Sequence, residues 1–194
     1  MTNVEFDAAN RGAPPWDIGR PQPAIVELAE AGALRGRVLD VCCGTGEHSL
    51  LAAARGFEST GLDASAAAIE QAQAKARQRG LAADFLVADA LALEAAEIGM
   101  FDTVIDTGLF HVFDDESRER YVRSLEGVTR VGGTLLLLCF SDRLQPLAVG
   151  PRRVSEAEIR AAFVGGWEIE ANEFEVVSLR FESFSAWPAT IVRP

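Results

Sequence analysis

The sequence predicts an α/β fold with a doubly wound, mostly parallel seven-stranded sheet and an antiparallel edge strand. Short apolar stretches of strand length alternate with helical stretches five times along the chain. Right-handed crossovers turn such an alternation into a parallel sheet with helices on both faces. The chain then ends in strand-like stretches that follow one another directly, which favours an antiparallel addition at one edge. Its 194 residues suffice for one domain with a buried core.

The predicted strands are short apolar runs, and each of the first four has an aspartate at or just after its end. The run at 134–140 is the most hydrophobic. We expect it at the centre of the sheet, because a strand covered on both faces is continuously apolar. The strands are expected at residues 38–41, 59–62, 85–88, 103–106, 134–140, 167–171 and 175–184.

Serine and glycine residues set the bounds of the predicted helices. Ser65 and Ser155 suit N-cap positions, and Gly56 and Gly80 suit the positions just after a helix. The pair Gly132-Gly133 is expected to end the helix before it. The helices are expected at residues 24–33, 47–55, 65–79, 114–130 and 155–163.

The chain divides into a lead-in segment at 1–23 and a single domain at 24–194. Residues 10–23 are rich in Gly, Pro and Arg, which indicates irregular structure. Residues 1–9 carry two acids and lack the basic start of a secretory signal. No apolar run approaches the roughly 20 residues of a membrane span, so no membrane partner is expected.

Charge and cysteine content exclude several classes of protein. The formal net charge is −11, which disfavours nucleic acid as a partner because nucleic-acid binding needs a basic face. Two of the three cysteines are adjacent, so neither a disulfide framework nor a metal site is expected. A reducing cytoplasm is the expected location, with the chain a monomer or a homodimer.

The loop at 42–46 is the first candidate site. It follows the strand at 38–41 and opens directly into a helix, and Gly44 and Gly46 let the backbone turn tightly and approach a ligand. A strand, a small-residue loop and a helix N-terminus are the parts of a nucleotide-type site. Many tight turns share this Gly-x-Gly pattern without binding anything, so the loop needs support from its surroundings.

Three aspartates supply that support. Asp40, Asp63 and Asp89 lie at the carboxyl ends of the first three strands, although one of them can simply cap the following helix. Asp63 is placed to accept hydrogen bonds from ribose hydroxyls, and Asp89 to meet an adenine amino group. Chance rarely ends three consecutive strands in this way.

Two cofactors compete for this site. A nicotinamide dinucleotide would place its pyrophosphate at the helix N-terminus, where Asp40 and Glu47 would repel it. S-adenosylmethionine carries an ammonium, a sulfonium, a ribose and an adenine but no phosphate, so it suits the acids better. Both an NAD(P)-dependent oxidoreductase and a non-catalytic S-adenosylmethionine-binding protein stay open as alternatives.

At these residues the chain resembles the class I S-adenosylmethionine-dependent methyltransferases. Residues 39–46 are similar to the first motif of that family, 61–63 to its ribose-binding acid, and 88–90 to its adenine-binding motif. Cys42 departs from the glycine usual there, and we expect it to adopt backbone angles open to a non-glycine residue. The resemblance implies a Rossmann-like methyltransferase fold, with cofactor contacts from Asp40, Cys42, Gly44, Gly46, Asp63, Ala64, Asp89, Ala90 and Asp106.

A narrower resemblance spans nearly the whole chain. Residues 14–23 resemble the entry segment of thiopurine, halide and thiol methyltransferases, and 101–111 and 150–155 resemble stretches of bacterial relatives of that group. The resemblance implies that 1–23 forms a lid over the cofactor, with Trp16 and Arg20 as cofactor contacts.

The methyl acceptor is expected to bind beside the fourth strand. Asp106 ends that strand and is a candidate cofactor or acceptor contact, and His111 is a candidate general base. The alternatives are that Asp106 caps the next loop and that His111 packs beside Phe110. Phe110 is also a candidate wall of the acceptor pocket, and Arg152, with its neighbour Arg153, is a candidate for orienting the acceptor. The sequence therefore predicts methyl transfer from S-adenosylmethionine to a small-molecule thiol, halide or heterocyclic N, O or S nucleophile.

Overall fold

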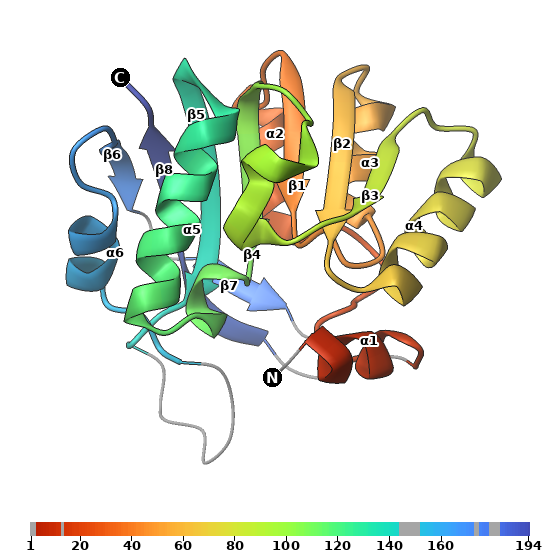
Figure 1. Cartoon of the computed structure of the whole chain (residues 1–194), viewed down its shortest axis with the longest axis horizontal. Helices are drawn as coiled ribbons and strands as arrows, with labels where there is room; N and C mark the ends of the chain where they lie inside the picture. The colour runs from red at the N-terminus through yellow and green to blue at the C-terminus, as the bar shows by residue number, and fades with distance from the viewer. Residues whose placement is uncertain (1–2, 13, 144–151, 173–174, 179–182) are drawn as a thin grey trace.

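A twisted central sheet organises the molecule in the order β3-β2-β1-β4-β5-β8-β6, with the short strand β7 paired to β8 (Figure 1). The computed structural model describes residues 3–12, 14–143, 152–172, 175–178 and 183–194. The predicted doubly wound α/β fold with antiparallel pairing at one edge is confirmed. The strands are β1 (Arg37–Val41), β2 (Glu58–Asp63), β3 (Asp84–Val87), β4 (Phe101–Thr107), β5 (Thr129–Phe140), β6 (Glu168–Asn172), β7 (Glu175–Ser178) and β8 (Ser183–Val192).

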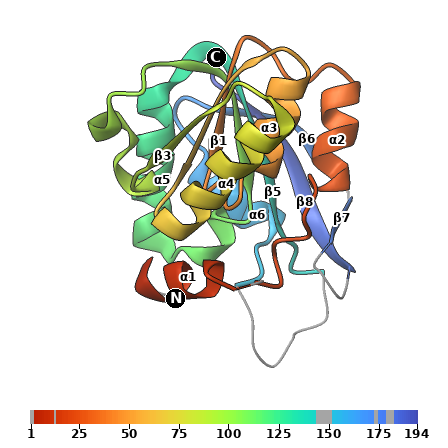
Figure 2. The same ribbon diagram turned by 90° about the vertical axis from the view of Figure 1, so that its right-hand side faces the viewer.

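Helices cover both faces of this sheet. Figure 2 shows α2 and α3 on one side and α5 on the other. The predicted caps are confirmed: Ser65 and Ser155 accept hydrogen bonds from the first turns of α4 and α6, and Gly80 ends α4 in a left-handed conformation. The helices are α1 (Asn3–Asn10), α2 (Pro23–Glu30), α3 (Glu47–Ala54), α4 (Ala66–Arg79), α5 (Asp115–Val128) and α6 (Glu156–Ala162), with 3₁₀ helices η1 (Ala90–Ala96) and η2 (Phe110–Val112).

Strand β1 lies where the order of the strands reverses: β2 and β3 follow on one side of it, and β4 and β5 on the other. It pairs in parallel with β2 on one side and with β4 on the other, so that Asp40 lies level with Gly61 and Ile105. Connections from neighbouring strands leave in opposite directions at such a point, and a crevice opens at the carboxyl ends of the strands. The topology therefore brings the ends of β1, β2 and β4 together at one edge.

The last part of the sheet differs from the sequence prediction. A single strand was expected at 175–184, whereas the structure has β7 and the longer β8, and 179–182 of that expected strand lie outside the described residues. Proline is unfavourable inside most strands, because it cannot donate to a ladder. In the structure β8 pairs with β6 up to Ala189 and with β7 from Ala186, so Pro188 falls between the two pairings.

Three further features differ from the sequence prediction. The run at 134–140 belongs to an interior strand, but β4 takes the middle place in the sheet. The strand that contains 134–140, β5, starts at Thr129, directly after α5. Gly132-Gly133 therefore lies inside β5 instead of ending a helix. The helix α1 was not expected at all. Of the stretch 150–155, residues 150–151 lie outside the described part of the chain.

Buried apolar side chains fill both sides of the sheet. The larger cluster lies under α5 and α6 and includes Phe101, Phe110, Tyr121 and Leu135. Smaller clusters lie under α2, α3 and α4. None of the helices in the described residues is long and apolar enough to cross a membrane.

Candidate active site at the carboxyl edge of the sheet

The loop at 42–46 turns through three left-handed residues. Gly44 has a φ of 52° and Gly46 a φ of 85°, and Cys42 has a φ of 59°. Cys42 thus departs from glycine at a left-handed residue, a region that is open to L side chains but that they rarely adopt. Gly46 has a second constraint: a Cβ there would lie 2.8 Å from Ala72 and from Phe85.

Open space lies beside Gly44. A Cβ built at this residue would meet no atom within 4 Å. Its backbone N–H donates to the Asp63 carboxylate at 2.9 Å, and the other oxygen of that carboxylate accepts from the N–H of Ser65 at 2.8 Å. Each carboxylate oxygen keeps a second lone pair. The loop and the end of β2 are thus held together with acceptors left for a ligand.

Asp40 is fully buried and has one oxygen without a hydrogen-bond partner in the described structure. Its Oδ2 accepts from the backbone N–H and the hydroxyl of Ser49, at 3.0 and 2.8 Å, whereas Oδ1 has no hydrogen bond. Burial, with repulsion from Asp63 and Asp106, raises the pKa of Asp40 to about 7 although the Ser49 bonds oppose the shift. A buried carboxylate oxygen in this state is suited to a cationic group of a ligand.

Three further cofactor candidates directly follow the second and third strands. Asp89 is exposed, and its side chain accepts a hydrogen bond from the N–H of Leu91 as the N-cap of η1. Ala90 is buried and Ala64 is exposed. Asp89 thus performs the capping role that the sequence left open, and its exposure leaves it accessible to a ligand as well.

The lead-in segment is attached directly to the glycine loop, by residues that the sequence analysis did not single out. The hydroxyl of Thr45 donates to Asp17 Oδ2 at 2.9 Å, and Asp17 Oδ1 accepts from the N–H of Gly19 at 2.8 Å. Trp16 is 37% exposed and Arg20 is exposed. The Asp-x-Gly spacing at 17–19 was the available signal, since Asp side chains commonly form such turns.

His48 makes the second attachment of this segment. Its Nε2 accepts from the backbone N–H of Gln22 at 3.1 Å, so the proton of the neutral ring lies on Nδ1. Nδ1 lies 3.4 Å from the hydroxyl of Thr107 and 4.0 Å from Asp40 Oδ1. Burial lowers the pKa of His48 to about 4, so the ring is neutral at pH 7. His48 therefore links the lead-in segment to β1 and β4.

Helix α1 makes a third attachment, at the start of α4. Asp7 Oδ1 accepts from the hydroxyl of Ser65 at 2.9 Å and from the N–H of Ala67 at 3.1 Å. Carboxylates are favourable at a helix N-terminus because its free N–H groups carry partial positive charge. Figure 1 shows α1 at the end of the sheet to which the parallel strands point.

Asp106 holds the loop after β4. Its Oδ1 accepts from the N–H of Leu109 at 2.8 Å, and its Oδ2 from the N–H of Phe110 at 3.2 Å and the hydroxyl of Tyr121 at 2.9 Å. Burial raises the pKa of Asp106 to about 6 against these bonds. The side chain is fully buried, so it acts on the site by positioning the loop.

His111 lies in the same loop with its ring stacked on Phe140, at a centroid distance of 4.6 Å. Its Nδ1 accepts from the backbone N–H of Phe140 at 3.2 Å, which places the ring proton on Nε2. Burial, with repulsion from Arg153 and Arg118, lowers the pKa of His111 to about 3. The ring is neutral at pH 7, with its free lone pair already used and Nε2–H available to donate.

The two adjacent arginines after the 144–151 stretch have different surroundings. Arg152 forms ion pairs with Asp115 at 2.6 Å and with Glu158 at 2.5 Å. Arg153 instead lies over the Phe140 ring, 4.9 Å from its centroid. Phe110 is fully buried in the core, so its ring has no surface to offer an acceptor. The structure thus brings Arg153, but not Arg152 or the Phe110 ring, beside His111.

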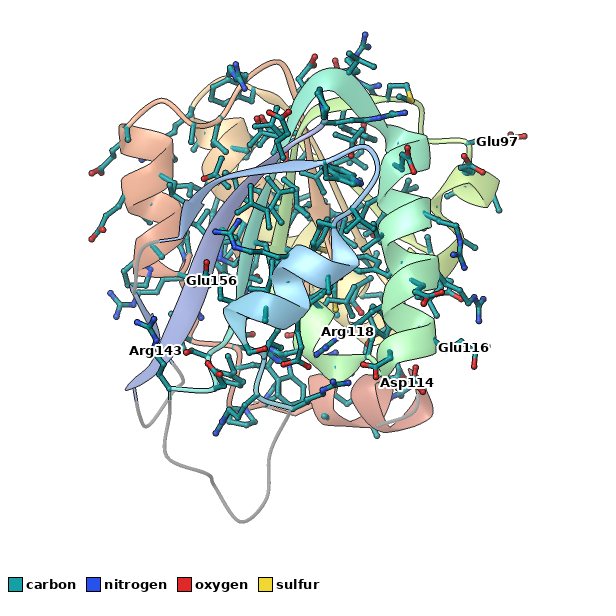
Figure 3. All side chains as sticks on the ribbon, turned by 90° about the vertical axis from the view of Figure 1, so that its left-hand side faces the viewer. Glu97, Asp114, Glu116, Arg118, Arg143 and Glu156 are labelled. Carbon is teal, nitrogen blue, oxygen red and sulfur yellow. The ribbon has the colours of Figure 1, made fainter. Side chains whose placement is uncertain are left out.

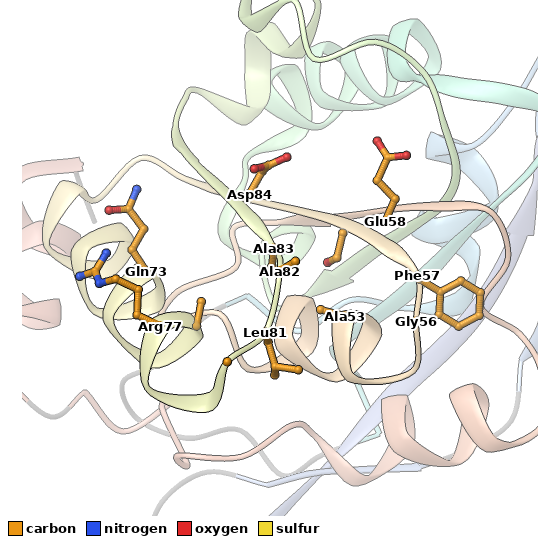
Figure 4. A pocket seen from close by; sticks show the side chains of 13 residues that line it. Ala53, Gly56, Phe57, Glu58, Gln73, Arg77, Leu81, Ala82, Ala83 and Asp84 are labelled. Carbon is orange, nitrogen blue, oxygen red and sulfur yellow. The ribbon is translucent and has the colours of Figure 1, made fainter.

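A large hollow lies away from these residues. It holds about 810 Å³ and lies where β2 and β3 begin, at the opposite edge of the sheet (Figure 4). Glu58, Gln73, Arg77 and Asp84 are among its lining residues, and it contains none of the predicted site residues. We place the site at the carboxyl edge instead, because the open glycine loop and Asp40, whose Oδ1 has no hydrogen-bond partner in the described structure, both lie at the carboxyl end of β1.

Similarity to known proteins agrees with this geometry. A family model described as a methyltransferase domain matches residues 38–133. The 2-heptyl-1-hydroxyquinolin-4(1H)-one methyltransferase of Mycobacteroides abscessus is 39% identical over 159 residues, covering 81% of this chain and 70% of that protein. The chain belongs to the class I S-adenosylmethionine-dependent methyltransferases. This assignment confirms the predicted family and enzyme class and sets aside the nicotinamide and non-catalytic alternatives.

Other relatives of this methyltransferase extend the similarity. A probable thiol methyltransferase 2 of Arabidopsis thaliana is 31% identical, covering 90% of this chain and 71% of that protein. A solved structure titled for the conversion of a disulfide bond into a thioacetal group during echinomycin biosynthesis has a TM-score of 0.89 and 37% identity, covering 99% of this chain and 93% of the other. A magnesium protoporphyrin IX methyltransferase of Synechocystis PCC 6803 with bound S-adenosylmethionine shares the fold, with a TM-score of 0.69 at 23% identity, covering 98% of this chain and 81% of the other.

Proposed function

We propose that this methyltransferase transfers a methyl group to a small-molecule thiol, halide or heterocyclic N, O or S nucleophile, at the carboxyl edge between β1 and β4. One observation carries the location: Asp40, at the end of β1 just before the glycine loop, is buried near Asp63 and Asp106, and its Oδ1 has no hydrogen-bond partner in the described structure. A cationic cofactor fits these residues, because it would supply the positive charge that this carboxylate lacks.

The cofactor half of the site is built from carboxylates and backbone. In our proposal Asp63 holds the ribose with its remaining lone pairs, Asp40 faces the positive end of the cofactor, and Asp89 meets the adenine. Gly44 leaves room for the cofactor, and the lead-in segment covers it through Asp17 and His48. When bound, S-adenosylmethionine supplies an activated methyl group, so the chain's main tasks are alignment and exclusion of water.

The acceptor half lies around η2. We assign His111 as a hydrogen-bond donor to the acceptor through Nε2–H, because its Nδ1 lone pair is taken by Phe140 and does not accept a proton. This replaces the general-base role expected from the sequence. Asp106 is a positioning residue that fixes the loop carrying His111.

The names of two relatives support the range of acceptors. One is a hydroxyquinolone methyltransferase and another a probable thiol methyltransferase. We keep a cytoplasmic location as part of the proposal, since Cys42, Cys43 and Cys139 are all free thiols. A monomer or homodimer is proposed for the assembly.

The test combines cofactor binding with turnover. Titration calorimetry with S-adenosylhomocysteine is expected to show binding by the wild-type protein and weaker binding by Asp63→Asn, by roughly 1–3 kcal/mol. Mass spectrometry would then follow methylation of a panel of aromatic thiols, phenols and N-hydroxy heterocycles. Unchanged binding in Asp63→Asn would remove that residue from the cofactor site, and binding without methylation of any compound would refute the proposed acceptors.

A further inference from the structure

The site has an acidic half and a basic half. On the cofactor side, Asp63 and Asp106 lie near enough to Asp40 to repel it. On the acceptor side two guanidinium groups lie near enough to His111 to lower its pKa, namely those of Arg118 and Arg153. This division of charge lies within a chain of net charge −11, so the basic half is a local feature.

Arg118 is buried between α5 and α6 and is partly neutralised. Figure 3 labels it on the inner side of α5, whereas Glu116 lies on the outer side. Its Nη1 donates to Glu158 at 3.1 Å, its Nε donates to the carbonyl of Phe110, and its Nη2 has no hydrogen-bond partner in the described structure. Glu158 is shared with Arg152. One carboxylate thus serves two guanidinium groups.

Arg153 has no carboxylate within 4 Å among the described residues. Its described contact is the face of Phe140, and its Nη1 is buried without a hydrogen-bond partner in the described chain. The same Phe140 ring stacks on His111 and its backbone N–H fixes the ring's tautomer. Phe140 therefore contacts both a cation without a carboxylate partner in the described chain and a hydrogen-bond donor. A nearby anion would stabilise such a half-buried cation.

None of the described groups in this half is suited to take a proton from an acceptor. The free lone pair of His111 is used by Phe140. Asp106 is buried and already accepts three hydrogen bonds, and Glu158 accepts from Arg118, Arg152 and Ser155. A nucleophile that must lose a proton in the site would find no base among these residues.

We propose that Arg153 and His111 form an acceptor subsite for small nucleophiles that bind as anions, as thiolates or as the oxyanions of acidic hydroxyl groups, with Arg153 as the countercharge. This inference rests on the proposed function and adds the charge state of the acceptor. The acceptor loses its proton to solvent before it binds. Its lone pair then forms the bond to the methyl carbon while the carbon–sulfur bond breaks, and that electron pair stays on the sulfur of S-adenosylhomocysteine.

The experiment compares an anionic with a neutral acceptor. The anionic series is a set of substituted thiophenols of graded acidity, and the neutral one is a dialkyl sulfide, which has no proton to lose. Arg153→Gln is expected to lower kcat/KM for the thiophenols about 10–100-fold, as for loss of a hydrogen bond to a charged group, and for the sulfide less than about 2-fold. Arg153→Lys should restore part of the loss. Arg160→Gln is the matched control, because that arginine is paired with Glu156 on α6.

The acidity of the acceptor gives a second test, through the pH dependence of kcat/KM. The rising limb of the pH profile of kcat/KM should follow the pKa of each thiophenol and not a constant enzyme group. A rising limb at the same pH for all acceptors would overturn this inference while leaving the proposed function standing. Equal losses of kcat/KM for the thiophenols and the sulfide in Arg153→Gln would do the same. If the wild-type protein binds S-adenosylhomocysteine but methylates neither series, the proposed function fails with it. Retained S-adenosylhomocysteine binding by the variants confirms that they fold.

Discussion

The hydroxyl of Thr45, in the middle of the glycine loop, donates a 2.9 Å hydrogen bond to Asp17 in the lead-in segment. The same hydroxyl accepts a hydrogen bond from Lys75 of α4 at 2.6 Å. One loop residue thus joins the first strand's loop, the lead-in segment and the helix after the second strand. A movement of the glycine loop, the lead-in segment or α4 would therefore disturb at least one of the two hydrogen bonds of this hydroxyl.

Thr45→Val should therefore loosen the lead-in segment. Loss of the hydroxyl leaves Asp17 without this donor, and we expect faster amide hydrogen exchange in residues 14–20 and weaker S-adenosylhomocysteine binding by about 1 kcal/mol. Lys75→Met keeps the bond between Thr45 and Asp17 and serves as the comparison. Equal effects of the two substitutions on exchange would show that the segment is held elsewhere.

Asp40→Asn should stabilise the cofactor-free protein at high pH. The folded-state pKa of Asp40 is raised to about 7, so the folded state binds this proton more tightly than the unfolded state does. Its contribution to the free energy of unfolding falls as the pH rises from about 4 to about 7, and stays low above that. Urea denaturation should find the variant more stable at pH 8 by about 2–4 kcal/mol and nearly equal to wild type at pH 4.

The same substitution should weaken cofactor binding, because the amide cannot supply a negative charge to a cationic ligand. If the variant and the wild type were equally stable at both pH values, the pKa of Asp40 would not be raised in the folded state, and the prediction would be wrong.

Two substitutions of His111 separate its two nitrogen atoms. Asn can keep an acceptor for the Phe140 N–H but has no donor at the Nε2 position, so His111→Asn should lower turnover about 10-fold. Gln can keep a donor at that position but not the acceptor, so His111→Gln should retain more activity and lose about 1–2 kcal/mol of stability. Steady-state rates and urea denaturation check this pair. A rate limb near pH 6–7 that vanishes in both variants would restore the general-base role.

Backbone conformation in the loop gives a fourth prediction. Cys42→Gly should keep or raise the free energy of unfolding, by up to about 1 kcal/mol, because glycine adopts a φ of 59° without strain. Gly44→Ala should lower it by about 1 kcal/mol at a φ of 52°, and its Cβ would also enter the space beside the loop. Thermal denaturation and titration with S-adenosylhomocysteine measure both effects. A stability loss in Cys42→Gly would show that packing of the thiol outweighs the strain.

Local signals in the sequence predicted much of the fold. The capping serines and Gly80 act through hydrogen bonds and angles that depend on neighbouring residues, so their roles could be assigned without the tertiary structure. Strand β8 extends beyond the expected end at residue 184 even though proline is unfavourable in most strands. Pro188 falls between the pairings of β8 with β6 and with β7, which is a long-range feature. Helix α1 was missed because its attachment, through Asp7 to α4, is made across 58 residues.

The sequence by itself determined the sheet, the glycine loop and the aspartates at the strand ends, since periodicity and the order of elements fix which edge they share. Only the tertiary structure decided how each group is used. Arg152 and Arg153 are neighbours in sequence, yet one is paired with carboxylates and the other lies on Phe140 beside His111. The protonation and hydrogen bonding of His111 depend on a backbone N–H 29 residues away. Contacts of this kind depend on packing between distant segments, which spacing along the chain does not specify.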